Sequence, residues 1–145
     1  MGKNILLLYD GSDASVRALG FILTILEGRG KLTILYVIDA DRVSDINKSV
    51  EREGKGREAV NVIISEIESR TRQQLSEFLR ICEKKGIKVR CEFKIGKVTT
   101  EILNEAISKK HDLIVLPSGG ILEEKIDHIL NKVLKSYPGN VLIVK

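Results

Sequence analysis

Two short polar loops of this sequence hold residue types that could bind a small anion or a nucleotide. Residues 10–12 (Asp-Gly-Ser) offer a carboxylate followed by a helix-capping serine. Residues 117–120 (Pro-Ser-Gly-Gly) offer backbone amides that the glycines leave accessible. Each loop follows an apolar run and precedes a helical pattern, so positive helix ends would point at a ligand bound there. The alternative is that the glycines only form tight turns, and the loops themselves leave both interpretations open.

Sharper catalytic signals are missing from the sequence. There is no Walker A motif, and no G-x-G-x-x-G follows the first apolar run. Residues 118–120 match the start of a pyrophosphatase loop of the S-G-G-x-D-S kind, but residues 121–123 do not complete it. The third apolar run ends without the aspartate of a receiver domain, and no serine lies in the G-x-S-x-G setting of a hydrolase. We therefore expect no catalytic residues.

Histidine and cysteine are scarce and widely spaced. His111 lies between a predicted helix end and the fourth apolar run, where an imidazole commonly assists a helix C-terminus, and His128 lies in the last helical pattern. Neither has the neighbours that a metal ligand needs, so no metal site is expected. Cys82 and Cys91 fall on apolar faces, which predicts buried core thiols.

Length and composition limit the class of protein. The chain has 145 residues, 43% hydrophobic and 30% charged, with a formal net charge of +4, which suits one domain with a substantial core. Aromatic residues make up 4% and tryptophan is absent, which disfavours a surface that stacks nucleic-acid bases. Two cysteines fit a reducing compartment. Because no apolar run approaches the roughly 18 residues of a membrane span and no signal peptide is evident, we expect a cytoplasmic protein without a membrane segment.

Five short apolar runs alternate with segments of helical periodicity. The expected strands are residues 5–9, 32–38, 89–95, 113–116 and 141–144. The expected helices start near Ser12 or Asp13, span residues 58–85, follow Thr99-Thr100, and span about residues 122–135. The expected inward faces of the first and third helices are Val16, Leu19, Ile22, Leu23 and Leu26, and Ile102, Leu103, Ala106 and Ile107. This alternation predicts an α/β fold, a single-domain open parallel sheet of five strands with helices on both faces.

The charge-rich residues 39–57, with Gly54 and Gly56, interrupt this alternation. They contain no complete apolar run, and we expect a mobile loop or part of a helix entry. Whether this stretch folds over a ligand site as a lid is left open.

The third apolar run differs from the others and indicates the order of the strands. Its apolar residues are Val89, Cys91, Phe93 and Ile95, which alternate with Lys88, Arg90, Glu92 and Lys94. Strict alternation means one wet face, so this strand is expected at an edge, which favours the order 3-2-1-4-5 over 2-1-3-4-5. The last strand then forms the other edge, where an apolar strand invites pairing. We expect a homodimer joined through Val141, Leu142, Ile143 and Val144; the alternative is a monomer whose last strand is shielded by side chains.

In this order the carboxyl ends of the first and fourth strands meet where the strand order reverses. Open parallel sheets bind ligands in the crevice at this point, so residues 10–12 and 117–120 would face each other across it. The crevice is therefore a candidate phosphate or nucleotide site.

Positive charge is concentrated in residues 80–97. This segment holds seven basic and two acidic residues, an excess of +5 that is larger than the net charge of the whole chain. A nucleic-acid patch would have this charge, but lysines that protect an edge strand from unwanted pairing would have it too. We favour edge protection, because stacking aromatics are missing from the outward face.

Four segments, in order and with matching spacing, resemble the universal stress protein family over nearly the whole chain. Residues 5–15 resemble its opening strand and D-G-S-x-x-S turn, and residues 35–39 are similar to its second strand, L-H-V-x-D. Residues 111–116 resemble its fourth strand, A-D-L-I-V-M-G, and residues 141–144 its V-L-V-V ending. The resemblance implies a Rossmann-like, adenine nucleotide alpha hydrolase-like fold and dimers paired through the last strand.

The family it resembles contains members that bind ATP and members that do not. Binders carry G-x-x-G, nine residues and then G-[S/T] after the fourth strand, and their adenine pocket uses an aspartate and a valine that match Asp10 and Val37. In this chain Pro117 replaces the first glycine, and only six residues separate Gly120 from Asp127.

These departures affect the part of the motif that would hold phosphates. Asp127 and His128 align with the G-[S/T] pair of the binders. Proline has no amide to donate, and an aspartate would repel phosphate groups. We expect triphosphate binding to be weak or lost, whereas the adenosine half of the crevice is retained.

The leading hypothesis is a cytoplasmic, dimeric, universal stress protein-like sensor or binding module in stress response, without strong catalysis. Its ligand would be ATP or another adenine nucleotide, if any. The candidate nucleotide-binding residues are Asp10, Gly11, Ser12, Val37, Ser118, Gly119, Gly120, Asp127 and His128. The alternatives are a nucleotide-binding switch with slow ATP hydrolysis and, less favoured, a nucleic-acid-associated protein that uses the basic edge.

Overall fold

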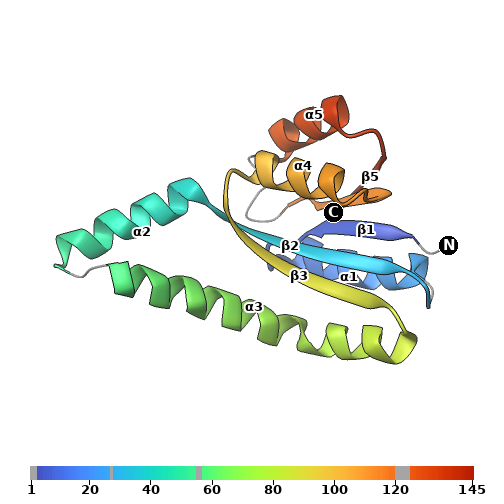
Figure 1. Ribbon diagram of the computed structural model, residues 1–145, viewed down its shortest axis with the longest axis horizontal. Helices are drawn as coiled ribbons and strands as arrows, with labels where there is room; N and C mark the ends of the chain where they lie inside the picture. Colours follow the sequence, from blue (N-terminus) through green and yellow to red (C-terminus); the bar gives the residue numbers. More distant parts are fainter. Residues whose placement is uncertain (1–2, 27, 55–56, 120–124) are drawn as a thin grey trace.

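The computed structural model describes residues 3–26, 28–54, 57–119 and 125–145, and they form a layered structure around one sheet (Figure 1). The five strands are β1 (Asn4–Leu8), β2 (Lys31–Asp39), β3 (Lys88–Gly96), β4 (Leu113–Pro117) and β5 (Asn140–Val144). All neighbouring strands are parallel, and their order is β3-β2-β1-β4-β5. The predicted order is therefore confirmed, with β3 at one edge of the sheet and β5 at the other.

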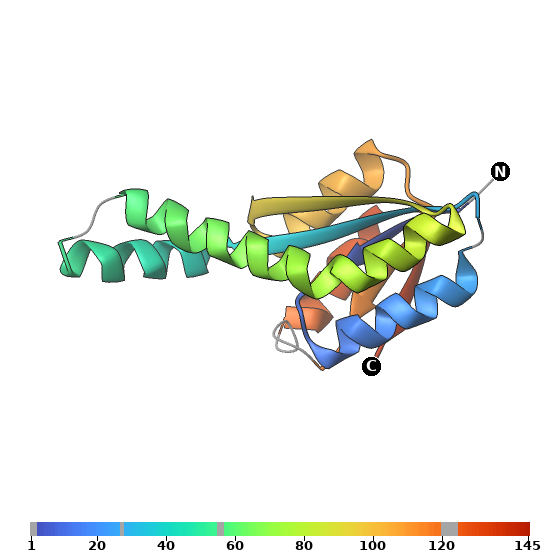
Figure 2. The ribbon, with the colours of Figure 1, turned by 90° about the horizontal axis from the view of Figure 1, so that it is seen from below.

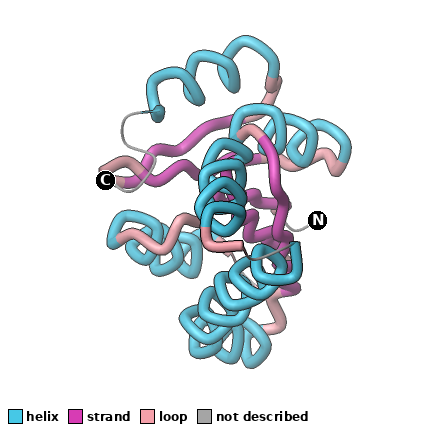
Figure 3. Tube along the Cα trace, turned by 90° about the vertical axis from the view of Figure 1, so that its left-hand side faces the viewer, coloured by secondary structure: helices cyan, strands magenta, loops and turns pink. Residues whose placement is uncertain are grey.

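Helices cover both faces of the sheet, as expected from the alternation (Figure 3). On one face lie α1 (Asp13–Ile25) and α3 (Arg57–Lys85), and on the other lie α4 (Val98–Ser108) and α5 (Ile126–Ser136). The side chain of Ser12 caps α1 by accepting a hydrogen bond from the backbone amide of Ser15 at 3.2 Å. At the end of α3 the chain turns at Gly86, whose φ of 76° favours glycine.

Each apolar strand supplies two separate cores because successive side chains point to opposite faces. Ile5 and Leu7 of β1 pack with α1 and α3, whereas Leu6 and Leu8 pack with α4 and α5. All four side chains are at most 1% exposed. This double burial is the physical reason that the first strand is apolar at nearly every position.

Residues 40–52 form a helix, α2 (Ala40–Arg52), so the expectation of a mobile loop or a helix entry between residues 39 and 57 is wrong. Asp39 caps the helix by accepting from the amide of Asp41 at 2.8 Å. Val43, Ile46 and Val50 recur at helical spacing, and only these residues of α2 are shielded from solvent. The remaining positions are solvated and hence polar, which is why the stretch resembled a loop.

The α2 helix and the first half of α3 extend beyond the sheet as a hairpin of two helices (Figures 1 and 2). We define the helical arm as residues 40–54 and 57–70. Within α3, Leu75, Phe78 and Cys82 are buried against the sheet, whereas Val62 in the arm is 56% exposed. One continuous helix therefore serves two environments.

Two predicted core residues lie on the surface instead. Val16 and Ile107 are 53% and 52% exposed, so their assignment to the inward faces of α1 and α4 is wrong. The buried side of α1 runs through Ser15, Ala18 and Ile22, and Val16 lies outside this stripe. On β5, Val141, Leu142 and Val144 are half-buried and Ile143 is 39% exposed.

Among the described residues, no helix is long and apolar enough to cross a membrane.

Candidate functional site

The turn after β1 holds a carboxylate in a fixed position. The Oδ1 atom of Asp10 accepts a hydrogen bond from the backbone amide of Ser12 at 2.9 Å, and Gly11 between them has a φ of 80°. Asp10 is only 8% exposed, and its Oδ2 atom is buried without a hydrogen-bond partner among the described residues. A buried acceptor without a partner costs free energy, so this oxygen is suited to receive a donor from a ligand.

Two adjoining pockets open at this turn. One, of about 250 Å³, lies between the turn, α2 and α3 and includes Gly11, Arg70 and Gln74 in its lining. The other, of about 60 Å³, lies at the ends of β1 and β2 and includes Val37 and Asp39. Both are lined by Asp10, Tyr36 and Arg42. We call these two pockets together the carboxyl-end site.

Arginine and aromatic side chains define the chemistry of this site. Arg42 from α2 and Arg70 from α3 bring positive charge to the larger pocket. Next to them, the rings of Tyr36 and Phe93 lie 5.9 Å apart, and the guanidinium of Arg72 lies 4.8 Å from the centre of the Phe93 ring. The site can therefore accept an anion beside a hydrogen-bonding carboxylate, with an aromatic pair behind it.

An ion pair next to this site joins the end of β2 to the residue just before α5. Lys125, just before α5, donates to the Oδ2 atom of Asp39 at 2.6 Å. This bond and the amide of Asp41 hold the pKa of the Asp39 carboxyl below its usual value.

The second predicted loop begins beside the end of β5, and that it faces residues 10–12 stays a prediction. The amide of Ser118 donates to the carbonyl of Val144 in β5 at 2.8 Å, and Gly119 has a φ of 94° and room for a Cβ, which would meet nothing within 4 Å. Asp127 and His128 are exposed on α5. None of these four residues lines the carboxyl-end site, and Gly120 lies outside the described residues.

Sequence reasoning missed most of the lining residues, among them Tyr36, Arg42, Arg70 and Gln74. Arg42 belongs to the charged stretch of residues 39–57, and the open question of a lid was the one signal that pointed toward it. Gln74 lies more than 60 residues from Asp10 in the sequence, yet its Oε1 atom would lie 3.6 Å from a Cβ added at Gly11. Contacts across such a distance leave no local pattern.

The two cysteines match their predicted structural role. Cys82 is 1% exposed in the core, and Cys91 is half-buried on β3. Burial raises the pKa of both thiols, which keeps them protonated and unreactive at neutral pH. Among the residues that the structure describes, no group of three or more His, Cys, Asp or Glu side chains could hold a metal ion.

The fold and the turn at Asp10 define an open parallel α/β protein with a candidate ligand site at the point where the strand order reverses. The chain belongs to the universal stress protein family, whose model matches residues 1–145. This confirms the resemblance seen in the sequence. No curated protein matches the chain significantly.

Solved structures share the fold. The hypothetical protein MJ0577 has a TM-score of 0.75 and 21% identity, with 99% of this chain and 95% of that chain covered. A universal stress protein in complex with cAMP has a TM-score of 0.59 and 18% identity over 99% and 97% of the two chains. A universal stress protein family protein from Arabidopsis thaliana with AMP bound has a TM-score of 0.59 and 14% identity over 99% and 91%.

Proposed function

We propose that this protein is an adenine-nucleotide-binding module with the base bound at Asp10. The observation that carries the proposal is the buried Oδ2 atom of Asp10, which has no hydrogen-bond partner among the described residues and belongs to a side chain that lines the same pockets as Tyr36 and Val37. An adenine base offers an exocyclic amine as donor and a flat apolar surface, which fits this combination. The structures of relatives with cAMP and AMP bound support the choice of adenine.

A monophosphate fits this chain better than a triphosphate. Pro117 has no amide for a phosphate, and the shortened segment before Asp127 leaves less backbone to surround a triphosphate. Arg42 and Arg70 supply two cations near the base, enough to balance one dianionic phosphate. The resulting function is sensing of adenine mononucleotides by a cytoplasmic stress-response protein, without strong catalysis.

The same proposal includes a homodimer joined through β5. This strand ends the sheet and carries the partly exposed Ile143. In a dimer with two-fold symmetry, β5 of one copy would pair with β5 of the other, so that the two sheets become continuous. The measurement is the mass in solution by light scattering, for the protein and for Ile143→Lys. A dimer that the substitution converts to a monomer supports the proposal, and a monomeric parent protein contradicts it.

Calorimetric titration with AMP, cAMP and ATP tests the ligand. We expect AMP to bind more tightly than ATP. Asp10→Asn should weaken AMP binding at least tenfold, because the side-chain oxygen keeps the bond from the Ser12 amide and an NH₂ group then replaces the Oδ2 acceptor. Asp45→Asn, an exposed carboxylate on α2 with the same charge change, is the matched control and should alter affinity less than twofold. Low-micromolar binding of ATP together with weak binding of AMP would overturn the preference for a monophosphate.

A further inference from the structure

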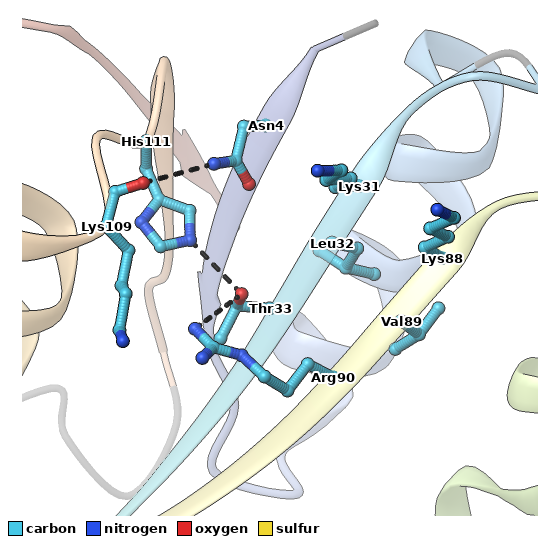
Figure 4. A pocket seen from close by; sticks show the side chains of 9 residues that line it. All are labelled: Asn4, Lys31, Leu32, Thr33, Lys88, Val89, Arg90, Lys109 and His111. Atoms are coloured by element: carbon cyan, nitrogen blue, oxygen red, sulfur yellow. Dashed lines mark hydrogen bonds between the residues drawn. The ribbon is translucent and has the colours of Figure 1, made fainter.

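Another pocket, separate from the carboxyl-end site, lies at the opposite end of the sheet, where the strands begin (Figure 4). It has a volume of about 360 Å³, on the scale of small-molecule sites. Nine residues line it: Asn4, Lys31, Leu32, Thr33, Lys88, Val89, Arg90, Lys109 and His111. Four of them are cations that are charged at neutral pH and none is a carboxylate. We call it the amino-end pocket.

The register of the sheet places the polar side chains of this pocket on one face. Asn4, Lys31 and Lys88 form one row across β1, β2 and β3, and Thr33 and Arg90 form part of the next row on the same face. Lys109 enters from the end of α4. Positive charge that is dispersed along the sequence is therefore gathered around one hollow.

A chain of contacts fixes the guanidinium of Arg90 at this pocket. Its Nη2 atom donates to Thr33 Oγ1 at 3.4 Å and forms a short ion pair with Glu105, and its Nε atom lies 3.4 Å from Glu92 Oε1. Its Nη1 atom has no partner among the described residues and can donate two hydrogen bonds. A guanidinium held in place this way loses little freedom on binding a ligand.

The histidine behind Thr33 completes this arrangement. The Nε2 atom of His111 lies 3.1 Å from Thr33 Oγ1, and the phenol of Tyr137 donates to the backbone carbonyl of His111 at 2.6 Å. Burial lowers the pKa of His111, so the neutral imidazole is favoured. His111 follows the end of α4, as expected, and it is buried there at 5% exposed.

Three lysines remain uncompensated around the pocket. Lys31, Lys88 and Lys109 are exposed, and no ion pair or side-chain hydrogen bond holds their ammonium groups among the described residues. Edge protection explains Lys88 on β3, but Lys31 lies on an interior strand and Lys109 follows a helix. Their shared feature is the pocket itself.

We propose that the amino-end pocket binds a small phosphate monoester. Three lysines would supply the charge, Arg90 would donate to two phosphate oxygens, and Asn4 would orient the ligand. A small molecule is favoured over nucleic acid because the cations line one open pocket of small-molecule size, and because no Phe, Tyr or Trp lines it. The pocket is separate from the carboxyl-end site, so the proposal stands or falls independently of the adenine site.

The test is a calorimetric titration with ribose 5-phosphate, repeated with ribose and with inorganic phosphate. The variant Lys31→Gln/Lys88→Gln should weaken binding of ribose 5-phosphate at least tenfold. The control Lys84→Gln/Lys132→Gln removes the same charge from exposed helix positions outside both pockets and should change affinity less than twofold. Amide shifts in a nitrogen-15 spectrum should appear at Thr33, Arg90 and His111 and not at Asp10.

Three results would overturn the proposal. The first is no binding of ribose 5-phosphate to the parent protein, and the second is an equal loss in both double variants, which would indicate diffuse attraction to a basic surface. The third is that binding of a single-stranded oligonucleotide depends on Lys31 and Lys88, whereas binding of the sugar phosphate does not. That result would assign the pocket to nucleic acid. Binding of ribose 5-phosphate but not of ribose, lost only in the pocket variant, supports it.

Discussion

The body of the molecule and its helical arm both have apolar residues at helical spacing, but the body buries far more of these side chains than the arm does. In the body, helices pack on a sheet, and side chains such as Ile102 and Val133 are completely buried. In the arm, two helices pack mainly on each other, and of its apolar residues only Val50 and Val60 are buried. Helix stability in proteins comes mostly from such packing.

The difference shows how stability and ligand contact are divided in this chain. The body determines the fold, whereas the arm contributes Arg42 and Arg70 to the carboxyl-end site. A segment held by few buried contacts opens locally at low free-energy cost. The arm is therefore suited to respond to a ligand without unfolding of the sheet.

Removing buried volume should have the largest effect on stability, and it should be larger in the body than in the arm. Ile102→Ala empties a fully buried position between α4 and the sheet and should lower the free energy of unfolding by about 3 kcal/mol. Ile63→Ala, at a half-buried position of the arm, should cost about 1 kcal/mol or less. Urea denaturation measures both, and equal losses would show that arm and body unfold as one equally packed unit.

Glycine-to-alanine substitutions should destabilise the body and the arm for different reasons, a steric clash in the body and an unfavourable φ in the arm. A Cβ at Gly139 would lie 2.2 Å from the hydroxyl oxygen of Tyr137, so Gly139→Ala should cost about 2 kcal/mol in global stability. At Gly54, in the arm, a Cβ meets nothing within 4 Å and only the φ of 73° is unfavourable. Gly54→Ala should cost about 1 kcal/mol, seen as faster amide exchange in the arm. An unchanged melting temperature for Gly139→Ala would contradict the prediction.

Acid should weaken the body before it weakens the base of the arm. His111 has a lowered pKa when folded, so below the ordinary value of 6.5 the unfolded chain binds a proton that the folded chain does not, and stability falls by at most about 1.4 kcal/mol per pH unit. Asp39 has a lowered pKa, so its contribution is present above 3.8 and is lost only as the pH falls further. Denaturation curves of the parent and of His111→Gln between pH 7 and 5 measure this. A slope that persists in His111→Gln would assign it to another group.

Helix propensity should produce the smallest effects. Gly20 lies inside α1, and a Cβ added there would meet nothing within 4 Å, so Gly20→Ala should raise stability by about 0.5–1 kcal/mol and increase the melting temperature. Ser49→Ala on α2 should increase amide protection in the arm and leave the melting temperature unchanged. An increased melting temperature for Ser49→Ala would mean that the arm belongs to the cooperative unit.

The sequence was sufficient for the strand order because burial on one or two faces leaves a residue pattern. The alternation on β3 placed it at an edge, and the apolar β1 had to be covered on both faces. The α2 helix was missed because three apolar residues among charged ones, followed by Gly54, are as typical of a loop as of a solvated helix.

The candidate site was predictable only where the chain itself forms it. The turn at Asp10 is local, since its hydrogen bonds join neighbouring residues. Arg42 became a site residue only through the geometry of an unexpected helix. The contact of Thr33 with His111 joins residues 78 positions apart, and no spacing rule predicts it.

The unequal lengths of the strands have a mechanical consequence. β2 and β3 have nine residues each and the other strands five, so their last four residues form a two-stranded ribbon of about 13 Å beyond the end of β1. The α2 helix starts at the tip of this ribbon and is about 20 Å long. If this helix turned as a rigid lever with its fulcrum at Asp39, a rotation of about 10° would move the far end by about 3 Å. The bond from Lys125 to Asp39 lies at that fulcrum and ties it to the residue just before α5.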